Sequence, residues 1–182
     1  MSAKSKVVTT LALQQAELIL TLYELRRETV MREARSYVGG EFLPSSAEEL
    51  VAIIAGGRYA GFVLQVYGYW DMVAAFVHHG ALDAALVYDT CQEMYFQYAK
   101  IRPYLSGFRR AMNLPEWMRS LERLVERSES GRKRLATMQK NLAAIAKVLA
   151  AQSSSHAAAA KASARTPRPS RPTTYRSRLR AD

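Results

Sequence analysis

The feature that most constrains the fold is residues 61–105, where apolar and aromatic side chains are dense and charges are few. Residues 62–79 are apolar nearly all round, which is typical of a helix enclosed by other helices. A second segment, residues 82–102, carries a seam at helical spacing: Tyr88, Cys91, Tyr95 and Tyr98. The turn at Gly80 is short, and short connections favour antiparallel packing. The stretch therefore predicts two antiparallel core helices, with its many aromatic residues serving as core in preference to a binding surface.

Two helices are predicted before this pair. Thr9 or Thr10 can cap a long helix that runs to about Val38, where two glycines follow. Residues 45–49 contain two overlapping capping boxes, in which a serine is followed three positions later by a glutamate. The short helix that they begin should end at Gly56-Gly57.

Proline and glycine divide the chain after the core pair. Pro103 should bend or restart the helix, and Pro115 should open the next one as its first residue. A last helix, residues 132–150, has an apolar seam and is too short to be stable alone, so we expect it to fold back onto the body. The seam consists of Leu135, Met138, Leu142, Ile145 and Leu149. The sequence predicts an all-α antiparallel bundle of five or six helices over residues 8–151.

Charge is divided unevenly along the chain. Residues 1–130 hold 14 Lys and Arg against 15 Asp and Glu, whereas residues 131–182 hold 12 against Asp182 alone. Residues 152–182 are rich in Ala, Ser, Pro and Arg and lack the apolar side chains that folding needs, which predicts a disordered basic tail. Its arginines can neutralise phosphates without reading sequence. They are Arg165, Arg168, Arg171, Arg176, Arg178 and Arg180.

Four charged residues of the body form a hypothetical buried polar network: Arg27, Asp71, Asp89 and Glu93. Asp71 lies in the most apolar helix, and a buried carboxylate needs a partner, which an arginine of the first helix could supply. Asp89 and Glu93 share a helix face four residues apart. A solvated face with weak ion pairs is the alternative for the first helix, and a mixed site of Asp71 with His78 is the alternative for a metal.

Several classes of protein are disfavoured. One cysteine excludes an internal disulfide, and Cys91 lies mid-helix without an activating neighbour, so no catalytic residue is assigned. Neither His78 nor His79 follows a glutamate by three residues, as a di-iron bundle requires, and we expect no metal and no cofactor. No uncharged run of 18 apolar residues is present, so we expect no transmembrane segment and a cytoplasmic location.

Two stretches, Tyr23–Arg35 and Tyr69-Trp70-Asp71, resemble a family of uncharacterised small bacterial helical proteins. The resemblance implies a helical fold and no activity. Taken with the charge distribution, it favours a non-enzymatic interaction or scaffold protein whose basic tail contacts an acidic partner, with nucleic acid as one candidate and a homo-oligomer as a further alternative. The alternative is a helical small-ligand sensor or enzyme built on the polar network.

Overall fold

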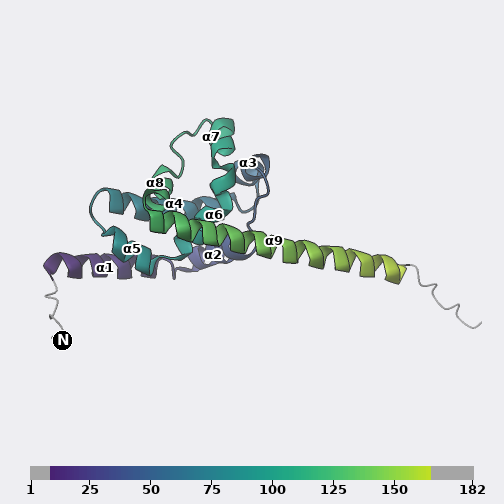
Figure 1. Cartoon of the computed structure of the whole chain (residues 1–182), viewed down its shortest axis with the longest axis horizontal. Helices are drawn as coiled ribbons and strands as arrows, with labels where there is room; N and C mark the ends of the chain where they lie inside the picture. The colour runs from purple at the N-terminus through teal and green to yellow at the C-terminus, as the bar shows by residue number, and fades with distance from the viewer. Residues whose placement is uncertain (1–8, 165–182) are drawn as a thin grey trace, which may run out of the picture. The chain divides into compact units, whose positions relative to one another are not determined.

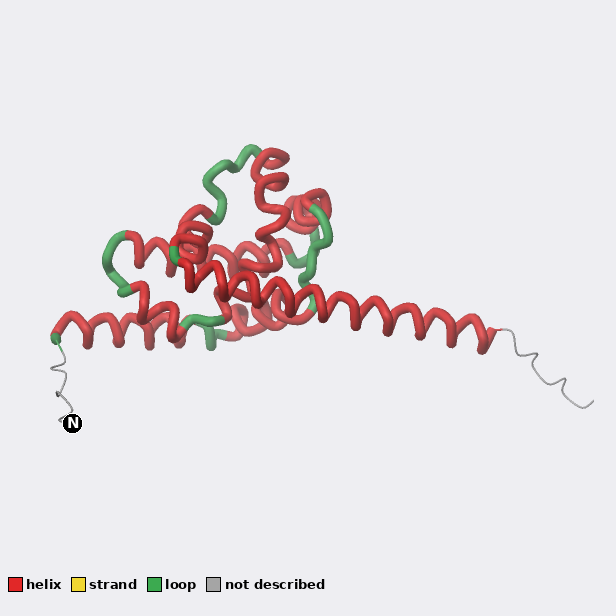
Figure 2. Tube along the Cα trace, in the orientation of Figure 1, coloured by secondary structure: helices red, strands yellow, loops and turns green. Residues whose placement is uncertain are grey.

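The computed structural model describes residues 9–164, and over that range it contains nine α-helices, one 3-10 turn and no strand (Figures 1 and 2). The α-helices are α1 (Thr10–Leu25), α2 (Thr29–Gly40), α3 (Ala47–Gly56), α4 (Ala60–His78), α5 (Ala84–Thr90), α6 (Glu93–Ile101), α7 (Leu105–Met112), α8 (Arg119–Arg127) and α9 (Glu129–Ala164). The all-α class is confirmed. The number of helices exceeds five or six because two predicted helices are each broken in two and a separate helix, α7, begins after Pro103. The chain divides into two compact units, the first ending at Leu142 and the second beginning at Ala143.

Helix α4 lies at the centre of the first unit, where α2, α3 and α8 pack against it. Its side chains Val63, Tyr67 and Trp70 are at most 1% exposed. The opposite strip is open, since Leu64 is 45% and Met72 is 36% exposed, so the prediction of a helix enclosed on every side is wrong for this strip. Among the described helices, α4 alone has the length and composition to cross a membrane, a property that it shares with the core helices of bundles.

The predicted first helix is two helices with a break at Glu28, whose backbone is extended (φ −57°, ψ 146°). Arg26 before the break and Arg35 after it both contact the carboxylate of Glu93. In an unbroken helix, residues nine positions apart lie about 13 Å apart along the axis and on opposite faces. The break therefore allows both arginines to reach one carboxylate.

The predicted helix over residues 82–102 is also broken, at Cys91 (φ −115°, ψ 51°). In a continuous helix the carbonyl of Thr90 would accept a hydrogen bond from Met94. Here it accepts one from the hydroxyl of Tyr23 at 2.5 Å, and Met94 bonds to the Cys91 carbonyl at 3.2 Å. The apolar seam keeps its role across the break. Cys91, Tyr95 and Tyr98 are each at most 3% exposed.

The predicted start of the helix is confirmed for α3 and wrong for α8. The Ser46 hydroxyl accepts a bond from the Glu49 amide at 3.1 Å, as a capping box requires. Pro115, by contrast, lies in a turn, and α8 begins only at Arg119, after Met118 in the left-handed region (φ 58°). The loop is held in this position by Trp117, whose ring centroid lies 4.5 Å from that of Phe108.

Helix α9 begins directly after Ser128, whose hydroxyl accepts a bond from the Gly131 amide at 2.9 Å. Within the first unit its seam folds back as expected, because Leu135 and Leu142 belong to the core and are 6% and 8% exposed. The helix continues to Ala164, beyond its predicted end near residue 150. The remaining residues of the predicted tail, 165–182, and with them the six tail arginines, lie outside the described residues.

Candidate anion-binding site

Asp71, the centre of the predicted polar network, contacts a helix end and no arginine. Its Oδ1 accepts a hydrogen bond from the Leu121 amide, 2.8 Å away in the first turn of α8. Met118, at the N-cap position of α8, supplies no side-chain cap. Burial raises the pKa of Asp71, while the amides of Leu121 and Ser120 act in the opposite direction. Asp71 therefore caps α8 from α4, and the prediction of an arginine partner is wrong.

The other predicted members are dispersed. Arg27 is exposed in the turn after α1. The Asp89 side chain is 76% exposed, with a guanidinium nitrogen of Arg134 3.9 Å away. Over the residues that the structure describes, no hydrogen bond or ion pair joins Arg27, Asp71, Asp89 and Glu93 to one another. The predicted four-residue network is wrong, and of its members only Glu93 takes part in a partly buried ion-pair cluster.

Glu93 pairs with two arginines that the sequence reading did not select. Arg35 donates from Nε to Oε1 at 3.1 Å and from Nη2 to Oε2 at 2.5 Å, and Arg26 also donates to Oε2. The guanidinium group of Arg26 lies over the Trp70 ring, 5.0 Å from its centroid. Burial raises the pKa of Glu93, but the bond from Arg35 and the charge of Arg26 outweigh it and hold the pKa below its usual value. The cluster joins α6 to the end of α1 and to the middle of α2 and serves the fold.

Lys100 is the second buried cation with a structural role. Its side chain is enclosed, the residue being 4% exposed, and Nζ donates to the carbonyl oxygens of Val38 and Gly39 at the end of α2. Burial lowers the pKa of Lys100 to about 8. A cation at a helix C-terminus satisfies carbonyls that have no partner within the helix, so Lys100 caps α2 from α6.

Catalytic and metal chemistry finds little support among the described residues. Burial raises the pKa of the Cys91 thiol, which disfavours the reactive thiolate. His78 directs Nε2 to the Ser120 carbonyl oxygen at 3.0 Å. Across residues 9–164, no group of three His, Cys, Asp or Glu side chains is placed to hold a metal ion.

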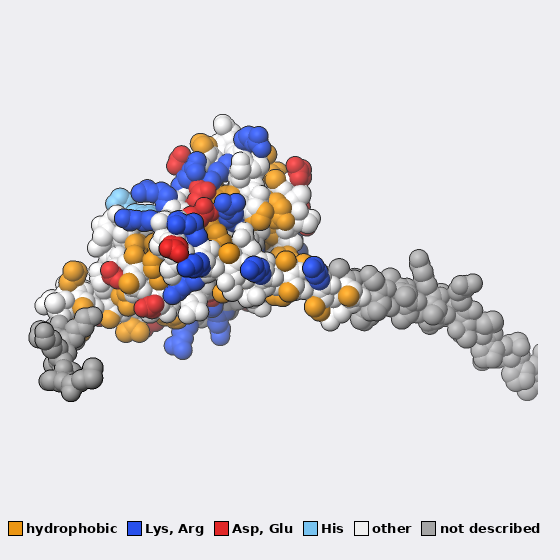
Figure 3. Space-filling view, viewed as in Figure 1, with side chains coloured by type: hydrophobic (Ala, Val, Ile, Leu, Met, Phe, Trp, Pro, Cys, Tyr) orange, Lys and Arg blue, Asp and Glu red, His pale blue; other side chains and the backbone are white. Residues whose placement is uncertain are grey.

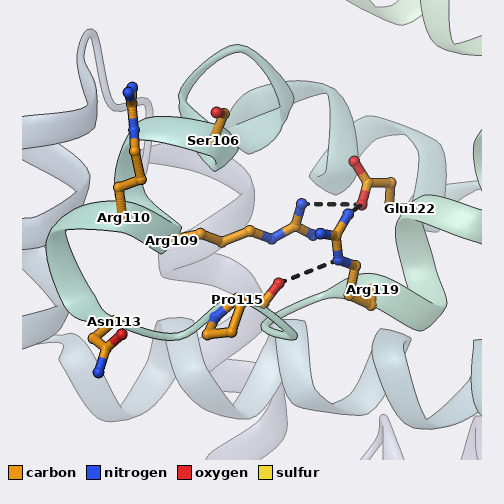
Figure 4. Close-up of a pocket in the computed structure, with 7 residues that line it drawn as sticks. All are labelled: Ser106, Arg109, Arg110, Asn113, Pro115, Arg119 and Glu122. Atoms are coloured by element: carbon orange, nitrogen blue, oxygen red, sulfur yellow. Dashed lines mark hydrogen bonds and ion pairs between the residues drawn. The ribbon is translucent and has the colours of Figure 1, made fainter.

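A cleft between α7 and α8, about 600 Å³ in volume, is bordered by several polar side chains (Figure 4). It is lined by Ser106, Arg109, Arg110, Asn113, Pro115, Arg119 and Glu122. Three arginines and one glutamate give this lining a net charge of +2, and Pro115 is its single apolar member. Such a surface suits a hydrophilic anion, since pockets for drug-like ligands are mainly apolar.

One carboxylate oxygen holds two guanidinium groups side by side in this cleft (Figure 4). Glu122 Oε2 lies 3.0 Å from Nη1 of Arg109 and 2.9 Å from Nη1 of Arg119. Arg109 also donates from Nε to the Trp117 carbonyl at 2.9 Å, whereas its buried Nη2 has no acceptor. Arg110 points away from the pair (Figure 4). Two positive charges therefore share one negative charge, and one buried donor remains unsatisfied.

A second cleft, also about 600 Å³, continues this surface along α8 and shares Arg119 and Glu122. We call the five arginines of the two clefts the arginine face: Arg109, Arg110, Arg119, Arg123 and Arg127. The two clefts contain two acids, Glu122 and Glu126. Lys and Arg side chains gather over α7 and α8 in the space-filling view (Figure 3). The combined charge of +3 makes this face a candidate anion-binding site.

The arginine face was not predicted from the sequence, because the charge averaged over the body is nearly neutral. Residues 102–127 hold six arginines and three glutamates, so a local excess was present. Arg109 and Arg110 lie on α7, and the other three lie on α8; no pattern in the sequence predicts that these two helices border one cleft. A window of charge over some 25 residues would have marked the segment, but not the cleft.

Comparisons with known proteins give a family and no function. Residues 11–128 match the sequence model of a family described as a domain of unknown function, DUF4760. The match spans α1–α8 and therefore includes the arginine face, whereas α9 and the basic C-terminal segment follow it. Neither the curated proteins nor the solved structures contain a significant match.

Proposed function

We propose that this chain, which belongs to the DUF4760 family, is a non-enzymatic binding protein for an acidic partner. The family is described as a domain of unknown function and therefore implies no activity. The structured contact is the arginine face, and the basic segment over residues 131–182 adds a second contact of the same sign. The observation that carries the proposal is the excess of arginine on that face: five arginines border two adjoining clefts that contain two glutamates.

The ion pairs of Glu122, the carboxylate that lines both clefts, favour binding over catalysis. Glu122 is engaged by two guanidinium groups, which suits the positioning of arginines better than proton transfer. The alternative of a sensor or enzyme built on Arg27, Asp71, Asp89 and Glu93 lacks a common site, because these residues occupy separate places in the fold.

Nucleic acid is the acidic partner that we propose first. Arginine binds phosphate through a planar fork of N–H donors, and several such contacts along a helix neutralise a phosphate backbone without reading its bases. Exposed arginines with no competing acid are best suited to this contact. Arg110, Arg123 and Arg127 meet that description, since each is exposed and none forms an ion pair within residues 9–164.

The test compares two triple variants in a fluorescence anisotropy titration of a labelled single-stranded oligonucleotide, with full-length protein. The first variant carries Arg110→Gln, Arg123→Gln and Arg127→Gln. The matched control carries Arg27→Gln, Arg32→Gln and Arg58→Gln, three exposed arginines elsewhere on the first unit. Both lose three charges, so a difference between them reports location and not net charge.

We expect the first variant to bind at least tenfold more weakly than wild type at 50 mM NaCl, and the control to bind less than threefold more weakly, because only the first removes phosphate contacts. Equal affinities for the two variants would reject the arginine face as the contact. Absence of oligonucleotide binding by wild type at this salt concentration would reject nucleic acid as the partner.

A further inference from the structure

We infer that the cleft between α7 and α8 is a binding site for a phosphate monoester group, with Arg109 and Arg119 as its anchors. This inference rests on the proposed function and names the chemical group that the arginine face recognises most tightly. It begins from the unsatisfied Nη2 of Arg109, in a residue that is 9% exposed. A buried guanidinium donor without an acceptor is costly, and a bound oxyanion supplies the missing acceptor.

Charge selects a dianion for this cleft. Arg109, Arg119 and Glu122 together carry +1, and Arg110 at the edge raises the charge of the lining to +2, whereas a phosphate monoester carries about −1.5 to −2 near pH 7. A phosphodiester of a nucleic-acid backbone carries a single charge and would leave the cleft half neutralised. Glu122 does not repel such a ligand strongly, because its Oε2 is already paired with both guanidinium groups.

Geometry provides for a ligand that contacts both arginines. The guanidinium groups of Arg109 and Arg119 lie side by side below Glu122 (Figure 4). Each guanidinium group is held at two points: Arg109 by the Trp117 carbonyl and Glu122, and Arg119 by the Pro115 carbonyl, 3.1 Å from its Nε, and Glu122. The Arg119 side chain is 47% exposed, so an oxyanion that enters the cleft can accept N–H donors from two arginines that are already oriented, with three oxygens available for them.

The rest of the cleft accommodates the alcohol part of the ester. A volume of about 600 Å³ exceeds what a phosphate group fills and lies within the usual range for small-molecule sites. Ser106 and Asn113 contribute a hydroxyl and an amide to the lining, which suits a hydroxylated ligand. Arg110 points away from the anchoring pair, so it adds long-range attraction and no direct contact (Figure 4).

The first experiment measures binding of glycerol 3-phosphate, glycerol and succinate to the full-length protein by isothermal titration calorimetry. Glycerol 3-phosphate should bind, and glycerol should not, because only the ester brings the dianion. Succinate has the same charge without the phosphate geometry and should bind at least fivefold more weakly. Failure of glycerol 3-phosphate to bind, or equal binding of succinate, would overturn the phosphate assignment.

Variants locate the site. Arg119→Gln should weaken glycerol 3-phosphate binding by about tenfold, the usual effect of losing one charge-assisted hydrogen bond. Arg110→Gln should weaken it less than threefold, and Arg32→Gln, an exposed control on α2, should leave it unchanged. Arg109→Lys keeps the charge but loses the fork and should also weaken binding; should it fail to fold, Arg119→Gln decides alone. Wild-type affinity in Arg119→Gln would overturn the site.

A second experiment distinguishes a free small molecule from the end of a polymer as the ligand. It also distinguishes failure of this inference from failure of the proposed function. An oligonucleotide with a 5′-phosphate should bind at least fivefold more tightly than the same oligonucleotide with a 5′-hydroxyl if the cleft accepts polymer ends; equal binding of the two, together with binding of glycerol 3-phosphate, assigns the site to small esters. Equal binding without glycerol 3-phosphate binding rejects the monoester site and leaves the proposed function standing. Binding of glycerol 3-phosphate without any oligonucleotide binding rejects the nucleic-acid proposal and keeps the site.

Discussion

Replacement of Asp71 tests how one side chain of α4 holds the start of α8. The carboxylate accepts the Leu121 amide at 2.8 Å, and Leu121 itself is fully buried. In Asp71→Ala that amide keeps no partner and has little access to water. Loss of a helix cap costs roughly 0.5–2 kcal/mol, and an unsatisfied buried donor costs roughly 1–3 kcal/mol. Since these are two descriptions of one lost bond, we expect a loss of about 2 kcal/mol in the free energy of unfolding.

The structure changes the magnitude that the sequence alone would suggest. Had Asp71 been paired with a buried arginine, its removal would strand that charge and cost roughly 3–5 kcal/mol. Asp71→Asn separates the two situations, because an amide oxygen still accepts the Leu121 bond but carries no charge. Burial raises the pKa of Asp71, so the folded state favours the neutral form, and Asp71→Asn should lie within about 0.5 kcal/mol of wild type.

The assay is urea unfolding followed by circular dichroism, at pH 7 and pH 4. A raised pKa in the folded state means that this state binds more protons than the unfolded one between the usual value of 3.8 and the raised value. The contribution of Asp71 therefore increases as the pH falls through that window, and the loss in Asp71→Ala should be as large at pH 4 as at pH 7, or larger. Asp83→Ala is the control, since Asp83 caps α5 locally at an exposed site and should cost about 1 kcal/mol.

Two results would refute this reasoning. A loss in Asp71→Ala that disappears at pH 4 would show that the carboxylate charge stabilises the fold, contrary to the direction of the pKa shift. A loss in Asp71→Asn as large as that in Asp71→Ala would show that the negative charge of Asp71, on which Arg109 and His78 act, stabilises the fold more than its hydrogen bond to the Leu121 amide does.

Three further predictions concern the ion-pair cluster, the buried lysine and the junction between α8 and α9. Glu93→Gln should lower the free energy of unfolding by about 3 kcal/mol at pH 7, because two partly buried arginines lose their shared partner. This loss should shrink as the pH falls through the lowered pKa of Glu93, and an effect below about 1 kcal/mol in urea unfolding would contradict a stabilising cluster. Lys100 has a pKa of about 8 in the folded state against 10.5 when unfolded, so the unfolded state binds more protons between these pH values. Wild type should therefore gain stability relative to Lys100→Met as the pH rises from 8 to 10.5, and a constant difference in melting temperature between the two proteins over that range would contradict this. Gly131→Ala should cost about 2 kcal/mol, since a Cβ would lie 2.1 Å from the Val125 carbonyl oxygen, whereas the exposed neighbour Ser130→Ala should be nearly neutral; equal denaturation midpoints would show that the junction relaxes freely.

Local signals in the sequence predicted those parts of the fold that local chemistry determines. The Ser46 capping box, the glycine turn at Gly80 (φ 77°) and the apolar faces of α4 and α9 are each determined by a few neighbouring residues. The breaks at Glu28 and Cys91 are different, because each depends on a partner more than 60 residues away in the chain. A helix-length apolar pattern carries no information about such contacts, so it predicted continuous helices.

The candidate site was harder to predict than the fold for a related reason. The sequence singled out Glu93, which is partly buried, but its partners Arg26 and Arg35 become neighbours only through the break between α1 and α2. It also singled out Asp71, whose hydrogen-bond partner is a backbone amide, which no side-chain pattern reveals. Charge averaged over 130 residues concealed the arginine face, whose members meet only because the folded chain places α7 and α8 on the border of one cleft.

The salt dependence of oligonucleotide binding tests the central claim, that the arginine face contacts phosphates, most directly. For single strands, the logarithm of the affinity falls with the logarithm of the salt concentration by about 0.7 for each phosphate neutralised. We expect the slope for the variant with Arg110→Gln, Arg123→Gln and Arg127→Gln to be shallower than that of wild type by about 2, because three contacts are lost. The control variant with Arg27→Gln, Arg32→Gln and Arg58→Gln should keep the wild-type slope. Identical slopes for all three proteins would contradict the claim.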